Sequence, residues 1–222
     1  DTTGSALISG KLTLGNSKVS ADLDTVKVVY SGYNIENQDN WLFSFNRGDR
    51  FIFEQFNIKS YDAVVNLSGE LSLNEQSDLK LEGKDLKITD LADIINKADS
   101  SYIISADEDI EGEFSAFMIT YKGTMDAPEI NADIKTNTLK YQETDIGVLT
   151  VSVEYQSNIA DALLKMENAE NKGTLTLKGS VPFQNPLSGD TLNQLNVSTM
   201  PVDINFKADN FQLDYFSLLV KD

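Results

Sequence analysis

Residues 78 to 95 read DLKLEGKDLKITDLADII, and residues 203 to 220 read DINFKADNFQLDYFSLLV. When the two stretches are aligned from their first residues, every apolar position of the first copy meets an apolar residue in the second; Leu81, for example, meets Phe206. In each copy apolar and polar residues first alternate with period two and then recur at helical spacing. This pattern predicts two short strands followed by one or two helical turns. Thr89 is the expected N-cap of the first helix.

A second pair of segments extends this repeat. Residues 65 to 71 (VNLSGEL) recur as residues 175 to 181 (LTLKGSV), with a shorter separation between the copies than in the first pair. The difference predicts an insertion within Gln184 to Ser198, the longest expected loop. We therefore expect residues 1–222 to form a single elongated β domain that holds a little over one repeat unit of about 110 to 125 residues. Because the chain starts and stops within a unit, we also expect it to be a fragment of a longer protein.

Composition restricts the classes of function. Hydrophobic residues make up 41% of the 222 residues, enough for a packed core. The chain has 18 Lys and Arg against 35 Asp and Glu, a net charge of −17. A surface this acidic repels phosphate backbones, so we expect no binding of nucleic acid.

The chain contains no cysteine and no histidine. This excludes disulfides, thiol nucleophiles and the usual zinc sites, and it removes the commonest general base. Paired carboxylates of the glycosidase type remain chemically available, but no constellation supports them beyond abundant Asp and Glu. The sequence therefore predicts a protein that is not an enzyme and that carries no cofactor or metal.

The rest of the chain alternates in the same one-sided way, as in residues 8 to 14 and 130 to 134. Two aromatic runs within residues 41 to 56 flank the turn Arg47-Gly48-Asp49, which spells the tripeptide recognised by integrins but also has the residues that a tight turn needs. We interpret it as a turn. A slip in the alternation predicts a β-bulge beside Gly147.

Two segments are ambiguous. Phe114 to Tyr121 is apolar on both faces, which indicates a central or covered strand. Asn158 to Asn168 fits either a short helical stripe or a strand, and we favour a strand from Leu163 onward.

The predicted fold class is mostly β, with one or two short helices. One-sided strands in succession fit an elongated antiparallel sheet that curls into a groove and leaves its apolar face exposed along the groove. They fit a β-sandwich equally, in which two such faces pack together. The periodicity alone does not separate these two architectures.

The second half of the chain resembles the repeating unit of the TamB-type translocation-and-assembly proteins, within the AsmA-like group of bridge-like lipid transfer proteins. The similar segments are residues 123 to 134 (GTMDAPEINADI), 139 to 141 (LKY), 147 to 149 (GVL), 173 to 182 (GTLTLKGSVP) and 201 to 213 (PVDINFKADNFQL). The resemblance covers about half of the chain, from Gly123 onward, with Val65 to Ile95 as a partial second copy. The segment from Asp1 to Phe56 has no matching motif.

This resemblance implies a β-taco, a long sheet folded lengthwise around an apolar trough. Members of the family are anchored in the inner membrane and cross the periplasm. They are implicated in moving phospholipid to the outer membrane and in outer-membrane protein assembly. The resemblance therefore implies phospholipid or other acyl chains as ligands, an outer-membrane barrel assembly protein as a partner, and a location in the cell envelope.

By this resemblance, the candidate groove residues are the aliphatic and aromatic residues of the one-sided strands. They are Leu79, Leu81, Leu86, Ile88, Ile130, Ile134, Leu139, Val151, Val153, Leu175, Leu177, Val181, Ile204, Phe206, Phe211 and Leu213. Each of them could instead be an ordinary core residue. The alternative function is a β-sandwich surface module that binds protein or glycan through its loops, which the Arg47-Gly48-Asp49 turn and the acidic surface would suit.

Overall fold

The computed structural model describes residues 4–30, 33–46, 50–90, 110–141, 144–168, 172–183 and 203–211. Most of these residues lie in 15 β-strands. The strands are β1 (Ser5–Leu14), β2 (Lys18–Tyr30), β3 (Tyr33–Glu36), β4 (Trp41–Asn46), β5 (Arg50–Ser60), β6 (Ala63–Ser72), β7 (Ser77–Lys84), β8 (Leu86–Lys87), β9 (Ile110–Glu111), β10 (Glu113–Gly123), β11 (Pro128–Tyr141), β12 (Thr144–Gln156), β13 (Ile159–Glu167), β14 (Thr174–Pro182) and β15 (Asp203–Asp209).

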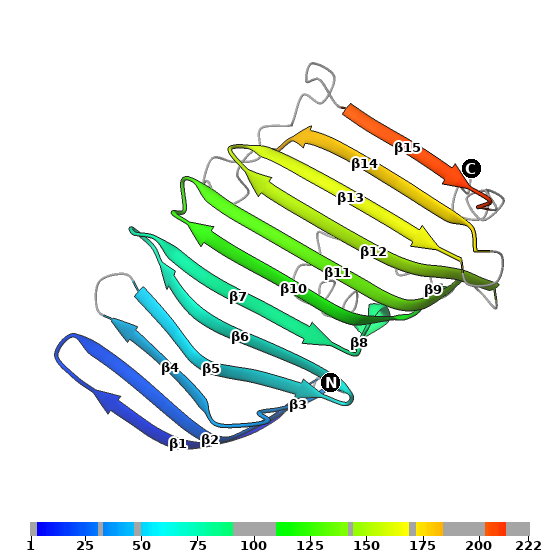
Figure 1. Cartoon of the computed structure of the whole chain (residues 1–222). Coiled ribbons are helices and arrows are strands. Elements are labelled where there is room, and N and C mark those ends of the chain that lie inside the picture. Colours follow the sequence, from blue (N-terminus) through cyan, green and yellow to red (C-terminus); the bar gives the residue numbers. More distant parts are fainter. Residues whose placement is uncertain are drawn as a thin grey trace.

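All 15 strands belong to one antiparallel sheet, in which most strands pair with their neighbours along the chain (Figure 1). Exceptions among the described residues are β3, which pairs with β2 and β5 but not with β4, and β7, β8 and β9, which do not pair with one another. The path of paired strands from β1 to β15 passes through 12 strands. β4 pairs with both β2 and β5, next to the end of β3. β8 pairs with β10 and continues the line of β7, and β9 pairs with β11 and continues the line of β10. The described strands therefore form the predicted elongated sheet and not the two packed sheets of a β-sandwich.

Directly opposed residues of paired strands lie on the same face of a sheet. Starting from β1, one ladder of opposed residues crosses eleven strands, and each of its members is apolar or glycine. The ladder is Leu12, Ala21, Phe43, Phe53, Gly69, Leu79, Tyr121, Ile130, Tyr155, Ala160 and Val181. We call the face that carries this ladder the apolar face.

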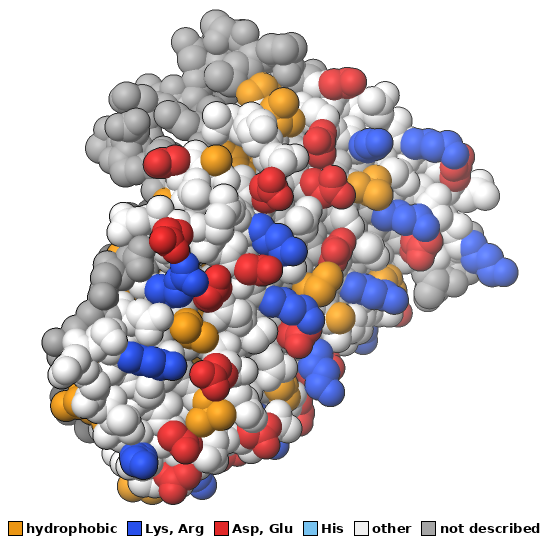
Figure 2. Space-filling view, turned by 60° about the vertical axis from the view of Figure 1, so that its left-hand side comes forward, with side chains coloured by type: hydrophobic (Ala, Val, Ile, Leu, Met, Phe, Trp, Pro, Cys, Tyr) orange, Lys and Arg blue, Asp and Glu red, His pale blue; other side chains and the backbone are white. Residues whose placement is uncertain are grey.

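The opposite face is polar. Its ladder from β6 to β15 is Ser68, Lys80, Thr120, Asn131, Glu154, Asp161, Ser180 and Asp203. Figure 2 shows a face of the molecule on which basic and acidic side chains are interspersed and hydrophobic ones are scattered. The one-sided alternation of the sequence thus produces a sheet with one apolar and one charged surface.

The sheet bends along a line where the pairing of successive strands is interrupted. Asp85 separates β7 from β8 with a positive φ of 56°, and the register shifts next to Phe114 in β10 and again after Lys135 in β11. The Thr136 side chain fills the interruption in β11: it is 1% exposed, and its hydroxyl accepts the Leu149 N–H at 2.9 Å. Interruptions of this kind bend strands, and Figure 1 shows the long strands curving toward β8 and β9.

A buried cluster lies beyond this line. Leu139, Tyr141 and Ile146 are all buried, and Ile88 and Met166 pack against them. Leu139 and Tyr141 belong to the apolar face. Because the cluster that they form with Ile146, Ile88 and Met166 packs on that face, the sheet bends toward it. The apolar face is therefore the inner one.

The repeat seen in the sequence is also a repeat of strand register. In the first copy Gly69 opposes Leu79, and in the second Gly179 opposes Ile204, the residues expected from the two sequence alignments. The predicted insertion falls between β14 and β15, and Gln184 to Ser198 lie outside the described residues. The connection between β6 and β7 occupies the same place in the first copy.

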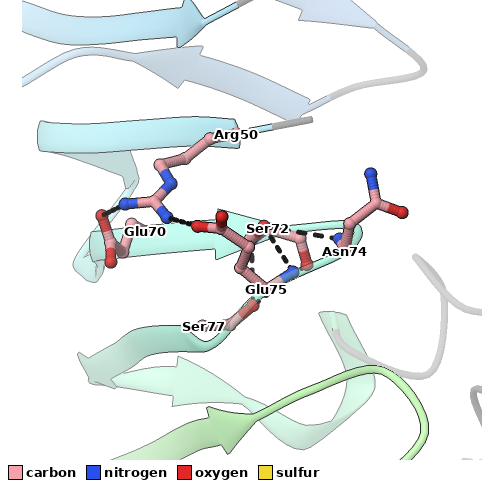
Figure 3. Close-up of polar contacts among 6 residues, drawn as sticks. All are labelled: Arg50, Glu70, Ser72, Asn74, Glu75 and Ser77. Carbon is pink, nitrogen blue, oxygen red and sulfur yellow. Dashed lines mark hydrogen bonds and ion pairs between the residues drawn. The ribbon is translucent and has the colours of Figure 1, made fainter. Parts of the chain in front are cut away.

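Polar contacts fix this β6–β7 connection and join it to β5 (Figure 3). The Ser72 N–H donates to the Ser77 hydroxyl at 2.9 Å, and the Ser72 hydroxyl accepts the Glu75 N–H at 3.0 Å. Both serines are buried. Arg50 at the start of β5 forms ion pairs with Glu70, at 3.1 Å, and with Glu75.

Three further predictions meet different outcomes. The bulge beside Gly147 is confirmed, because the register shifts on both sides of that residue, and Gly147 has a φ of 132°. The expected start of a strand at Leu163 is wrong, since β13 begins at Ile159 and pairs along its whole length with β12 and β14. The helical stripe considered for Asn158 to Asn168 is not formed.

The first predicted helix begins at Ile88, one residue before the expected N-cap Thr89, and is described as far as Asp90. The rest of it, the second helix and the turn Arg47-Gly48-Asp49 lie outside the described residues. The flanking β4 and β5 pair as the predicted hairpin.

Candidate functional site

The structure brings the predicted groove residues together on the apolar face. Leu79, Ile130 and Val181 belong to the ladder that begins at Leu12. Two neighbouring ladders contain most of the others. The first is Leu81, Ile119, Ala132, Val153, Ala162, Gly179 and Ile204. The second is Gly83, Phe117, Ile134, Val151, Leu164, Leu177 and Phe206.

The remaining candidates lie beside these ladders. Leu86 opposes Phe114, and Leu175 opposes Met166 on the same face. Leu139 and Ile88 belong to the buried cluster at the bend. Phe211, just after β15, is 8% exposed, and Leu213 lies outside the described residues.

Exposure of the apolar face rises toward the end of the sheet at β15. Along one ladder of opposed residues, Leu164 on β13 is half-buried, Leu177 on β14 is 37% exposed, and Phe206 on the last strand is 57% exposed. Ile8 and Leu12 on β1, the other end of the sheet, are 59% and 62% exposed. Among the described residues, no second sheet covers this face. Between these two ends most residues of the apolar face are half-buried, and Ala21 and Tyr155 are buried. A partly exposed apolar surface of this extent is typical of a ligand or interaction site.

The aromatic side chains of β4 and β5 extend the same face, and the sequence analysis does not assign them to the groove. Trp41 packs against Phe56 with ring centroids 4.2 Å apart, and Phe45 against Phe51 at 4.6 Å. The alternation of residues 41 to 45 (WLFSF) carries the signal, because it places every second aromatic on one face. The resemblance does not reach this region, which has no motif of the family.

The strand that is apolar on both faces, β10, has a defined orientation. Phe117, Ile119 and Tyr121 lie on the apolar face, and Met118 lies on the polar face, 39% exposed. A Cβ atom on Gly83 of the neighbouring strand would collide with the Phe117 ring. The glycine therefore provides the space in which this ring lies flat against the sheet.

Two tyrosine hydroxyls are the polar groups within the first ladder. Burial raises the pKa of Tyr121 and of Tyr155 above the ordinary value of 10.0. The Tyr155 hydroxyl donates to the Asn158 side-chain oxygen at 3.1 Å, at the end of its strand. Both phenols thus stay neutral, and their rings add apolar area to the inner face.

One hollow among the described residues lies on the polar face. It has a volume of about 480 Å³, and its lining includes Glu82, Lys84, Asp133 and Lys135 beside Met118. Its charged rim differs in character from the apolar ladders. The described residues contain no cluster of three or more acidic side chains arranged to hold a metal ion, and none of their helices is long and apolar enough to cross a membrane.

Comparison of the chain with models of known protein families, with curated proteins and with solved structures finds no match. The resemblance to the TamB-type proteins therefore rests on the sequence segments given above.

Proposed function

We propose that the apolar face binds the acyl chains of phospholipid and lets them move along the sheet. The observation that carries this proposal is the unbroken apolar ladder from Leu12 to Val181, which faces the inside of the bend. The polar face keeps the sheet hydrated on its outside. No catalytic step is part of this function.

The geometry suits an extended chain molecule. A ladder of opposed residues runs perpendicular to the strands, and each step from one strand to the next covers about 4.8 Å. The 12 strands of the pairing path therefore provide an apolar track of about 50 Å. Acyl chains would lie along this track, with their head groups in water at its open side.

Energetics favour movement over tight retention. Each buried CH₂ group contributes about 0.8 kcal/mol, so a chain of about 16 carbons gains roughly 10 kcal/mol or more gross. Because neighbouring steps of the ladder have similar apolar side chains, a shift along the track removes about as much buried area as it adds. Sliding is therefore less costly than leaving the track.

The proposed setting is the cell envelope. By the resemblance of its second half, the chain would lie in the periplasm as part of a longer protein anchored in the inner membrane. It would support lipid transport to the outer membrane, the assembly of outer-membrane proteins, or both. An outer-membrane barrel assembly protein would then be its partner.

Two adjacent leucines of β13 provide a matched test. Leu164 lies on the apolar face, and Leu163, 41% exposed, lies on the polar face. The purified chain and the variants Leu164→Asp and Leu163→Asp are compared by native mass spectrometry and by lipid extraction. We expect phospholipid to co-purify with the parent chain and with Leu163→Asp, and to be lost from Leu164→Asp.

Leu177→Asp, on the next strand of the same ladder, should lose lipid as Leu164→Asp does. Circular dichroism shows whether each variant retains its strands. A lipid-free parent chain that also takes up no phospholipid from vesicles would overturn the proposal. Equal retention by folded Leu164→Asp and Leu163→Asp would overturn it too.

A further inference from the structure

We propose that copies of this chain associate end to end, with β15 of one copy pairing with β1 of the next, so that the sheet continues from copy to copy. Within the described residues, β1 and β15 are the two ends of the pairing path, and each pairs on one side only. Every residue of both strands is exposed. Long exposed edge strands of this kind are templates for pairing with another chain.

The number of strands favours this arrangement. All neighbours on the pairing path are antiparallel, and the path contains 12 strands, so β1 and β15 run in opposite directions. A second copy in the same orientation therefore presents its β1 antiparallel to β15. The alternation of strand directions continues across the junction without a break.

The apolar faces also match. On β15 the residues of the apolar face are Ile204, Phe206 and Ala208, and on β1 they include Ile8 and Leu12. Only every second register between β15 and β1 places these apolar residues on the same side of the sheet, because a shift of one position turns every side chain to the other face. Both end strands thus carry apolar side chains on the same face as the strands inside the sheet.

Charge selects among the allowed registers. With Phe206 opposite Ile8 of the second copy, every residue of β15 has a partner on β1, and Asp203 lies opposite Lys11 on the polar face. Another register with the apolar faces aligned would instead place Lys207 opposite Lys11. Opposite charges across strands stabilise a pair, and like charges destabilise it. We therefore assign the register with Asp203 opposite Lys11.

The junction is a head-to-tail contact between two different edges. Such contacts do not close on themselves unless the rotation between copies forms a ring, so they generate open chains of copies. The apolar track of one copy would then continue into the next. This inference does not depend on lipid binding, since the pairing uses the strand edges and is tested on protein from which lipid has been removed.

Sedimentation velocity of the delipidated chain over a range of concentrations tests the proposal. We expect the average sedimentation coefficient to rise with concentration. Lys11→Glu and Asp203→Lys should each weaken association about five-fold. The double variant Lys11→Glu with Asp203→Lys should restore it, because the opposite charges then exchange places.

Lys135→Glu serves as the control. It makes the same change of charge at an exposed position on the polar face of β11, in the middle of the sheet, and should leave association unchanged. A chain that stays monomeric at all concentrations would overturn the proposal. Association that is insensitive to Lys11→Glu, or that the double variant fails to restore, would overturn it as well.

Discussion

Buried polar side chains lie where the pairing of strands is interrupted. Thr136 accepts the Leu149 N–H, the Asn57 side chain accepts the Gln38 and Asp39 N–H groups, and the Asn168 amide donates to the carbonyls of Asp145 and Ile146. All three of these polar residues are buried. They supply partners for backbone groups that the ladder of strand hydrogen bonds leaves free.

Replacement of Thr136 by valine should therefore destabilise the fold. Valine keeps the shape but removes the acceptor of the buried Leu149 N–H, which costs about 1–3 kcal/mol. Urea unfolding followed by circular dichroism measures this loss. Thr150→Val, at an exposed position of the polar face, should stay within about 0.5 kcal/mol of the parent chain. Equal effects of the two substitutions would contradict the role given to Thr136.

The tyrosines of the apolar face provide a spectroscopic signal for the proposed ligand. Their folded-state pKa is raised by burial, so the associated stability is present below the ordinary pKa of 10.0 and is lost as pH rises through the folded value. An acyl chain on this face removes more water and should raise the pKa of both tyrosines further.

Absorbance titration of tyrosinate formation, with and without bound phospholipid, tests this expectation. We predict that lipid moves the late part of the titration to higher pH. In Tyr121→Phe the part of the shift that belongs to this residue should disappear. A titration that bound lipid leaves unaltered would place the ligand elsewhere.

Among the structural elements, strands with unbroken alternation could be predicted from the sequence, and those whose pattern admits two periods could not. Ile159, Ala162, Leu163 and Met166 make a helical stripe, so the local pattern places the start of β13 too late. Pairing with β12 and β14 determines this segment, and such long-range contacts are not visible in a local pattern.

The candidate site could be predicted to a similar degree. The repeat identifies the apolar residues of β7, β14 and β15 because their spacing recurs, and one-sided alternation together with the resemblance identifies those of β11 and β12. Neither the repeat nor the resemblance reaches the aromatic residues of β4 and β5. Their place on the face follows from the opposition of Phe43 to Ala21 and Phe53, which only the pairing register gives.

Glycine at the bulge of β12 should be necessary for that element. Gly147 has a φ of 132°, and a Cβ atom there would collide with the Glu167 carbonyl oxygen. We expect Gly147→Ala to destabilise the chain by about 1–3 kcal/mol, because alanine is strained in this conformation. Gly15→Ala, at a turn whose φ is not in the left-handed region, should cost less. Thermal unfolding of both variants measures the difference, and the opposite order would contradict the assignment.

For the molecule as a whole, the sequence leaves two architectures open because one-sided strands fit both. The register of pairing decides between them: successive strands join a single sheet, and the apolar ladder crosses its width. The direction of the bend toward the apolar face also emerges only from the complete sheet, since it depends on interruptions in three neighbouring rows of strands.

A single curved layer should be more extended than a packed globule. A compact domain of 222 residues has a radius of gyration of about 17 Å. We predict a clearly larger value for the monomer by small-angle X-ray scattering, measured at a concentration where sedimentation shows no association. A value near that of the compact globule would contradict the open sheet.

Lipid binding on the apolar face is tested most sharply by a photo-crosslinking scan along β13. A photoreactive amino acid is placed singly at each position from Ala160 to Met166, and lipid adducts are counted by mass spectrometry after irradiation with phospholipid. Adjacent positions of a strand point to opposite faces. We predict adducts at positions 160, 162, 164 and 166 and none at the positions between them. Adducts without this alternation, or confined to the odd-numbered positions, would contradict lipid binding on the apolar face.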